Sequence, residues 1–195
     1  MRRFATPAVI LLLILIGVGG FFLGRQGWVG LKTGNSINKA QPDKTGQIRD
    51  IKSGGEKVVL FFLRSTPTDF YLKPVLWRVK NNGDKHLEAL KALFAGPSPG
   101  SNLQPLFPKG TKVLGLNIKD GVAYLNLNSE ATRLNVGASG EALAVASIVN
   151  TLTKFPDVFR VKILVEGKEV ESLAGHFDLT GLLRYDEQVI DPDLF

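Results

Sequence analysis

The side chains that most often carry chemistry are sparse in this sequence and form no recognisable catalytic or metal site. The two histidines, His86 and His176, lie far apart, and neither has a second ligand at the spacing of a helix-borne metal site. His176 and Asp178 could supply two ligands, but the sequence offers no others for them, so a hydrogen-bonded structural role is favoured for His176. Cysteine is absent, which excludes disulfides and thiolate metal sites. We predict no metal and no cofactor.

An anion could bind where Gly137–Glu141 precedes an apolar helical pattern, because main-chain N–H groups are exposed at a helix start. The segment lacks the lysine of a phosphate-binding loop and the strand–turn context of a nucleophile elbow. Ser139 is therefore predicted to be only the N-cap of the helix. Glu130, Glu141 and Asp178 form no acid–base pair that the sequence reveals. The protein is accordingly predicted not to be an enzyme, and a hydrolase would need a polar cleft.

Aromatic side chains suggest binding instead of catalysis. On an exposed sheet face, an aromatic ring can stack on the sugar rings of a cell wall. Phe61, Phe62 and Trp77 are interpreted as core or rim residues. Tyr124 is the exception, because the hairpin register given below places it on the face opposite the buried leucines. It is the one predicted site residue, as a glycan contact.

The elements that would position these residues begin with two extended segments and a helix. Val58–Leu63 is a short β-branched and aromatic run that predicts a buried strand, and Val75–Lys80 after Pro74 is a second candidate strand. Leucines at helical spacing predict an amphipathic helix over Lys85–Ala95. Asp84 is its predicted N-cap, and Gly96-Pro97 ends it.

A hairpin around Asp120-Gly121 is the most informative local pattern. This dipeptide favours a two-residue type I′ turn, because both of its positions require positive φ. The turn predicts that Leu116 opposes Leu125, that Ile118 opposes Ala123 and that Leu114 opposes Leu127 on one buried face. The other face receives Asn117 against Tyr124 and Gly115 against Asn126.

A second helix follows Ser139 and ends before Pro156. Its wide apolar surface predicts deep burial, with Leu143, Ala146 and Val149 against the sheet. Val161–Val165 returns as a strand, and Glu166-Gly167 turns the chain toward Val170. With Val75–Lys80 set aside, the order is strand, helix, hairpin, helix, strand. This order predicts an α+β fold with two helices packed on one face of a mainly antiparallel sheet.

The chain of 195 residues has a net charge of +6, and the charge is unevenly distributed. Residues 1–57 hold nine Lys and Arg against three Asp and Glu, whereas the remaining 138 residues hold fifteen of each. The folded part is therefore neutral, which disfavours nucleic acid as a partner. No charge occurs from Phe4 to Gly24, a length that can cross a hydrocarbon layer of about 30 Å.

Arg2 and Arg3 precede the apolar stretch, so its N-terminus is predicted to be cytoplasmic and the rest to lie outside. A cleaved signal peptide is the alternative to a retained anchor. We therefore predict a single-pass protein of the cell membrane. Its predicted parts are a transmembrane signal-anchor (1–25), a flexible linker (26–57) and an α+β domain (58–195).

Five segments of the chain form a pattern whose order and spacing are specific. They are Leu90–Pro97, Pro108–Leu114, Asp120–Leu127, Ile148–Pro156 with Val161, and Gly175–Leu179. Together, over roughly Val58–Leu183, they resemble the GerM-type domain of sporulation and spore-germination proteins.

The resemblance implies a secreted or membrane-anchored protein without established catalytic residues. It also implies a fold similar to ring-building domains of sporulation membrane complexes, which assemble side by side. Some members carry two copies of the domain, whereas this chain has room for one.

Two binding functions are therefore predicted. The first is a membrane-anchored, extracytoplasmic and non-catalytic scaffold in sporulation or spore germination, which binds protein partners or copies of itself. The second is a peptidoglycan-binding module that uses Tyr124.

Overall fold

The computed structural model describes residues 55–81 and 83–192, which belong to one compact unit. The predicted membrane span, Phe4–Gly24, lies outside these residues, as does nearly all of the predicted linker. Within the described ranges, no helix combines the length and apolar character needed to cross a bilayer.

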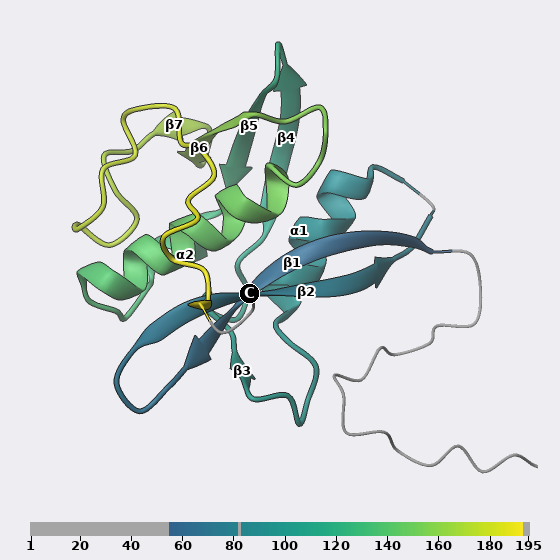
Figure 1. Cartoon of the computed structure of the whole chain (residues 1–195). Helices are drawn as coiled ribbons and strands as arrows, with labels where there is room; N and C mark the ends of the chain where they lie inside the picture. The colour runs from purple at the N-terminus through teal and green to yellow at the C-terminus, as the bar shows by residue number, and fades with distance from the viewer. Residues whose placement is uncertain (1–54, 82, 193–195) are drawn as a thin grey trace, which may run out of the picture. The chain divides into compact units, whose positions relative to one another are not determined.

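Two α-helices and seven strands make up the domain (Figure 1). In chain order they are β1 (Glu56–Ser65), β2 (Phe70–Val79), α1 (Lys85–Ala95), β3 (Leu103–Gln104), β4 (Val113–Lys119), β5 (Val122–Leu127), a 3₁₀ helix (Ser129–Thr132), α2 (Ala138–Leu152), β6 (Arg160–Val165) and β7 (Lys168–Glu169).

The α+β class is confirmed, but the single sheet of the sequence-based prediction is wrong. The strands form two sheets, one ordered β2-β1-β3 and the other β4-β5-β6-β7. Residues 75–79 of the segment set aside in the prediction belong to β2, which starts earlier at Phe70, ends before Lys80 and pairs with β1 along its whole length. Pro74 lies inside this strand, and an edge strand tolerates proline because one side of it needs no ladder hydrogen bonds.

The second sheet is mixed, which corrects the expectation of a mainly antiparallel sheet. β4 pairs with β5 and β6 pairs with β7 in antiparallel fashion, whereas β5 and β6 are parallel neighbours. The reason is the connection, since the chain leaves β5, runs back along α2 and enters β6 in the same direction.

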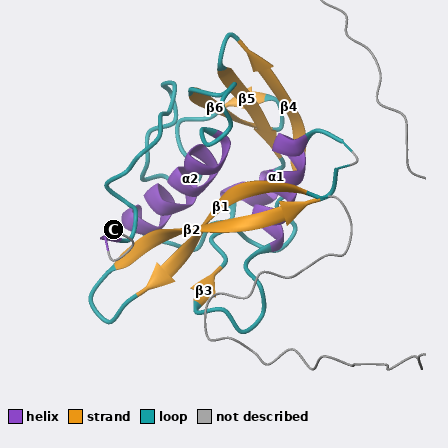
Figure 2. Ribbon diagram, turned by 45° about the vertical axis from the view of Figure 1, so that its right-hand side comes forward, coloured by secondary structure: helices purple, strands orange, loops and turns teal. Residues whose placement is uncertain are grey.

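The helices lie between the two sheets, as Figures 1 and 2 show. α1 packs against β1, β2 and β4, and α2 packs against β1, β2 and β6. The main core joins the two layers through side chains such as Leu60, Leu90, Leu125 and Ile148. α2 is therefore enclosed on nearly every side, which confirms its predicted deep burial.

β1 is buried on both of its faces. Val58, Leu60 and Phe62 belong to the main core, while Phe61 belongs to a smaller cluster with Leu72, Leu143, Ala146 and Ile190. This explains the unbroken apolar run in the sequence, because a strand covered on both sides does not alternate.

The hairpin of β4 and β5 has the predicted register from Ile118 opposite Ala123 to Gly115 opposite Asn126, and Lys119 lies opposite Val122 next to the turn. Asp120 and Gly121 have φ of 51° and 74°, as a type I′ turn requires. The prediction for Leu114 is wrong, because an irregularity of the β-bulge kind shifts the register and places Val113 opposite Leu127. Leu114 is the extra residue, and it is 51% exposed.

The start of α1 is as predicted, but the start of α2 is not. The carboxylate of Asp84 accepts a hydrogen bond from the main-chain N–H of His86, and Gly96 ends the helix with φ of 85°. α2 begins at Ala138 with Gly137 as its N-cap residue, so Ser139 lies inside the first turn and is not the cap. Its N-cap makes no side-chain hydrogen bond.

We predict that Gly121→Ala destabilises the domain more than Gly167→Ala does. Both glycines occupy hairpin turns with positive φ, so each substitution incurs a backbone cost of about 1–2 kcal/mol. A Cβ at Gly121 would also lie 2.4 Å from Cδ2 of Phe159, whereas a Cβ at Gly167 meets open space. The extra clash should add about 1–3 kcal/mol, measured as the free energy of unfolding in urea. Equal losses for the two variants would contradict this account.

Candidate functional site

The predicted contact residue Tyr124 lies on the outer face of the second sheet, opposite the helices. Its side chain is 40% exposed, and its cross-strand neighbours are Asn117 on β4 and Lys162 on β6. The exposure predicted from the hairpin register is therefore confirmed. Phe61 and Phe62 are buried, and Trp77 packs against the ring of Phe62, so these three are core or rim residues as expected. The glycan contact of Tyr124 stays a prediction.

Cationic side chains lie on the outer face of β4 and β6, on either side of β5. Lys119 on β4 and Arg160 on β6 flank Val122 in one row across the sheet, and both are exposed. Lys162 is buried beside Tyr124, where its Nζ donates to the carbonyl of Thr180 and lies 2.9 Å from Oε2 of Glu169. β4, β5 and β6 together contain no Asp or Glu.

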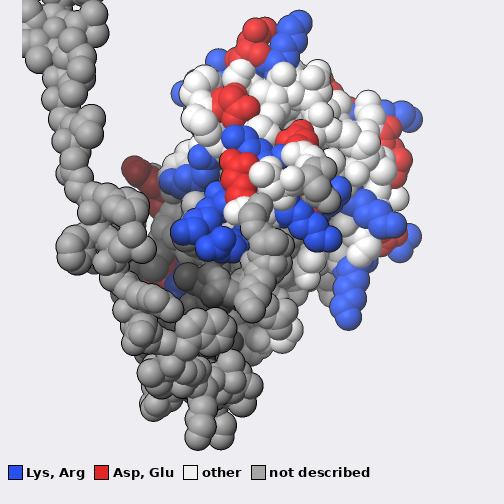
Figure 3. Space-filling model, turned by 90° about the vertical axis from the view of Figure 1, so that its right-hand side faces the viewer, with Lys and Arg blue, Asp and Glu red and all other residues white. Residues whose placement is uncertain are grey.

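The face drawn in Figure 3 has a different character. Lys and Arg side chains there are interspersed with Asp and Glu. Charges of both signs therefore share the coloured part of this face. Lys85 and Glu56 form an ion pair of the domain, with 3.5 Å between Nζ and Oε1.

The main-chain groups on the two sides of the first sheet have different hydrogen-bond partners. On β1, the main-chain N–H of Phe61 donates to Oγ1 of Thr151 in α2 at 3.3 Å, and β3 pairs with Leu63 and Arg64. On β2, Leu72 exchanges hydrogen bonds with Val189 and Asp191 near the C-terminus. Asp191 also bonds to the guanidinium of Arg64. The rest of the outer β2 edge pairs with no strand among the described residues.

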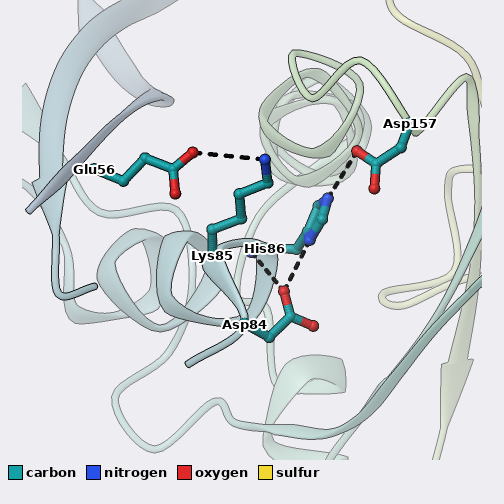
Figure 4. Close-up of polar contacts among 5 residues, drawn as sticks. All are labelled: Glu56, Asp84, Lys85, His86 and Asp157. Carbon is teal, nitrogen blue, oxygen red and sulfur yellow. Dashed lines mark hydrogen bonds and ion pairs between the residues drawn. The ribbon is translucent and has the colours of Figure 1, made fainter. Parts of the chain in front are cut away.

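A polar cluster that the sequence did not predict surrounds His86 (Figure 4). The ring is 6% exposed, with Nδ1 lying 2.8 Å from Oδ1 of Asp84 and Nε2 lying 3.0 Å from Oδ1 of Asp157. Phe155 packs on the ring with a centroid separation of 4.3 Å. Two ionised carboxylates can both accept from the imidazole only when both ring nitrogens carry protons.

The His86 cluster changes the acidity of its two carboxyl groups. Burial raises the pKa of Asp84, but hydrogen bonds from the His86 side chain and main chain outweigh it, so the pKa lies below its ordinary value. The side-chain hydrogen bond with His86 is the main cause that lowers the pKa of Asp157. Both carboxylates are therefore stabilised in their charged form by the fold.

Glu141, for which the sequence predicted no role, makes a second polar cluster. Its carboxylate is fully buried and accepts main-chain hydrogen bonds from Leu173 and Ala174 at Oε1 and from His176 at Oε2, all between 2.8 and 2.9 Å. The start of α2 thus organises an irregular segment near the C-terminus. A charge buried in this way requires such partners.

The remaining candidates, His176 and Asp178, make hydrogen bonds only within the domain. His176 is exposed, and the hydrogen bond found for it is made by its main chain to Glu141 and not by its ring. Asp178 accepts from the hydroxyl of Thr180, which is the main cause of its lowered pKa, and from the main-chain N–H of that residue. Across the described residues, no group of three or more His, Asp and Glu side chains could hold a metal ion.

Known proteins share both the sequence pattern and the fold. The profile of the family described as "Germane: Sporulation and spore germination" matches residues 59–171. The chain belongs to the Germane family. It is 31% identical over 134 residues to the spore germination protein GerM of Bacillus subtilis strain 168. The match covers 64% of this chain and 35% of GerM, so the chain spans about a third of the length of that relative.

Solved structures of Germane-family domains have similar folds. The tandem GerMN domains of the sporulation protein GerM from Bacillus subtilis superpose with a TM-score of 0.63 and 27% identity, covering 76% of this chain and 51% of that one. The first GerMN domain of the same protein gives a TM-score of 0.52 and 22% identity, covering 66% and 97% of the two chains. The predicted resemblance to a GerM-type domain is confirmed.

We predict that Glu141→Gln destabilises this Germane domain by about 2–3 kcal/mol, measured by urea unfolding. One side-chain oxygen remains to accept from Leu173 and Ala174, but the new amide N–H₂ faces the N–H of His176. Amide hydrogen exchange should quicken at residues 173–176. Glu130→Gln, which removes only a surface pair with Arg133, is the matched control and should change stability by less than about 0.5 kcal/mol.

We predict that Asp157→Asn flattens the loss of stability in acid. A carboxyl group whose pKa is lowered by folding contributes stability above its unfolded pKa of about 3.9, and this is lost as the pH falls through the folded value. The unfolding free energy of the wild type should therefore fall more steeply than that of the variant between about pH 5 and pH 2. Asp69→Asn, at an exposed turn, should keep the wild-type slope, and a variant as steep as the wild type would contradict the assignment.

Proposed function

We propose that this Germane-family chain is a membrane-held, non-catalytic module that acts outside the cytoplasm in sporulation or spore germination by binding protein partners or copies of itself. Membership of the family supports the process. The uncharged stretch Phe4–Gly24 with Arg2 and Arg3 before it supports the membrane tether and its orientation.

The open edge of β2 is the observation that carries the binding role. An unpaired strand edge presents N–H and C=O groups to which another chain can add a strand. Since Leu72 bonds outward to Val189 and Asp191, residues two, four and six positions further along direct their main-chain groups to the same side. Pro74 has no N–H to offer there, so the usable edge runs from Leu76 to Arg78.

Side chains on this strand add apolar contact area. Leu76 is exposed and shares a sheet face with Phe70, which is the other exposed apolar side chain of β2. An added strand would gain main-chain hydrogen bonds from the edge and apolar contacts from this face. By contrast, the buried polar side chains of α2 bond to main-chain groups of the domain itself, as seen for Glu141, Asn150 and Thr151. They stabilise the fold and do not form a binding surface.

We predict that Leu76→Pro abolishes partner binding while the domain stays folded. The substitution removes an N–H that points away from β1, so no ladder bond within the sheet is lost. The measurement is site-specific photocrosslinking of the full-length chain in sporulating cells, with the crosslinker at Arg78. A defined protein adduct should form with the wild-type edge and fall at least tenfold in the variant.

Two controls make the edge experiment decisive. Leu76→Thr keeps the N–H and should keep the adduct, and a crosslinker at the exposed Lys91 of α1 should not form it. Undiminished crosslinking of folded Leu76→Pro protein would remove the edge as the binding surface.

A further inference from the structure

We propose that the outer face of the second sheet binds a carboxylate-bearing glycan. The platform consists of Gly115, Asn117, Lys119, Tyr124, Asn126 and Arg160, from β4, β5 and β6. This inference goes beyond the protein-binding role proposed above and uses a different surface, so either can fail without the other.

Cross-strand register places an aromatic ring among amide groups on this platform. Tyr124 lies directly opposite Asn117, and the next pair along the hairpin on the same face is Asn126 with Gly115. The Oδ1 of Asn126 accepts from the main-chain N–H of Gly167 at 2.7 Å, which fixes the orientation of its amide. A ring flanked by two amides, one of them held in place, can stack on a sugar and bond to its hydroxyl groups.

The charge of the platform selects an anionic ligand. Lys119 and Arg160 flank Val122 one row away from Tyr124, and both side chains are exposed. The three strands contain no carboxylate. Two acids from other segments act on Lys162 in the row of Tyr124: Glu169 is paired with it, and Asp178, which also feels its charge, is hydrogen-bonded to Thr180. The two exposed cations are therefore available to bind carboxylates on the ligand.

The composition favours a glycan over an apolar protein partner. The centres of protein–protein interfaces are enriched in apolar side chains and depleted of charge. Around Tyr124, the platform instead offers two amides, two cations and a glycine, while the apolar side chains on the same face, Val122 and Leu164, are buried and half-buried. Such groups match the many hydroxyls and acidic substituents of a cell-wall glycan.

Gly115 leaves space on the sheet beside the aromatic ring. Its φ is not in the left-handed region, and a Cβ placed there would lie 4.0 Å from the Cβ of Asn126, which is ordinary contact. The glycine is therefore not needed for the backbone conformation. A β-branched side chain at this position would fill the platform and keep the strand.

The test is cosedimentation of the detergent-solubilised full-length chain with peptidoglycan sacculi stripped of teichoic acids. The wild type should sediment with the sacculi, and the bound fraction should fall at least tenfold with Tyr124→Ala and with Gly115→Val. Tyr124→Phe keeps the ring and should bind within about threefold of the wild type. Lys119→Gln combined with Arg160→Gln should weaken binding and reduce its salt dependence.

Matched controls separate the platform from general adhesion. Phe70→Ala removes another exposed aromatic ring, and Lys80→Gln removes an exposed cation, yet both variants should bind like the wild type. Sacculi whose carboxylates have been amidated should bind the wild type at least tenfold less well.

Clear outcomes would overturn the inference. It fails if the wild type does not sediment, if folded Tyr124→Ala and Gly115→Val bind like the wild type, or if amidated sacculi bind equally well. It also fails if these two variants lose the protein adduct of the β2 edge while retaining sacculus binding, because the platform would then serve a protein. Retained sacculus binding by Leu76→Pro would show that the two proposed surfaces act independently.

Discussion

The need to satisfy buried main-chain groups shapes this domain, and polar side chains of α2 meet it where the strand ladders do not. The helix is enclosed by both sheets, yet it carries four buried polar side chains, of which Ser147 bonds within the helix and the other three bond to other segments. Glu141 holds an irregular segment by three N–H groups, Asn150 exchanges two hydrogen bonds with the main chain of Asp186, and Thr151 accepts from the edge of β1. Each bond replaces a ladder partner that the topology does not supply. The polar residues of α2 thus hold together segments that have little regular structure of their own.

Local signals in the sequence were sufficient for the elements that depend on their own residues. Asp84 and Gly96 bound α1 as expected, because a cap is made within one turn of the helix. Asp120-Gly121 set the hairpin register as far as Gly115, and this register correctly placed Tyr124 on the outside. The prediction went wrong at Leu114, where a bulge that no turn signal announces changes which residue faces inward.

Features that depend on distant residues were not predictable in the same way. The strands form two sheets because of which strands pair with each other. Hydrophobic periodicity indicates which face of a strand is buried, but it does not indicate its neighbours. His86 looked isolated because its second partner, Asp157, lies on a loop after α2. Ser139 had the residue type and position of an N-cap, but the N-cap residue of α2 is Gly137. The side chain of Glu141 instead accepts a hydrogen bond from the main chain of His176. Buried polar residues within an apolar helix were the available signal for Glu141, although they do not identify the partner.

The hydrogen bonds between Leu72 and the segment Val189–Asp191 have a consequence for the order in which the domain is completed. The ribosome synthesises β2 long before it adds the residues that close this part of its edge. Until residues 189–191 emerge, Leu72 exposes its main-chain groups, and the cluster around Phe61 lacks Ile190. The nascent chain can therefore form its first hairpin early, but this part of the domain cannot acquire its final stability before those residues have been added.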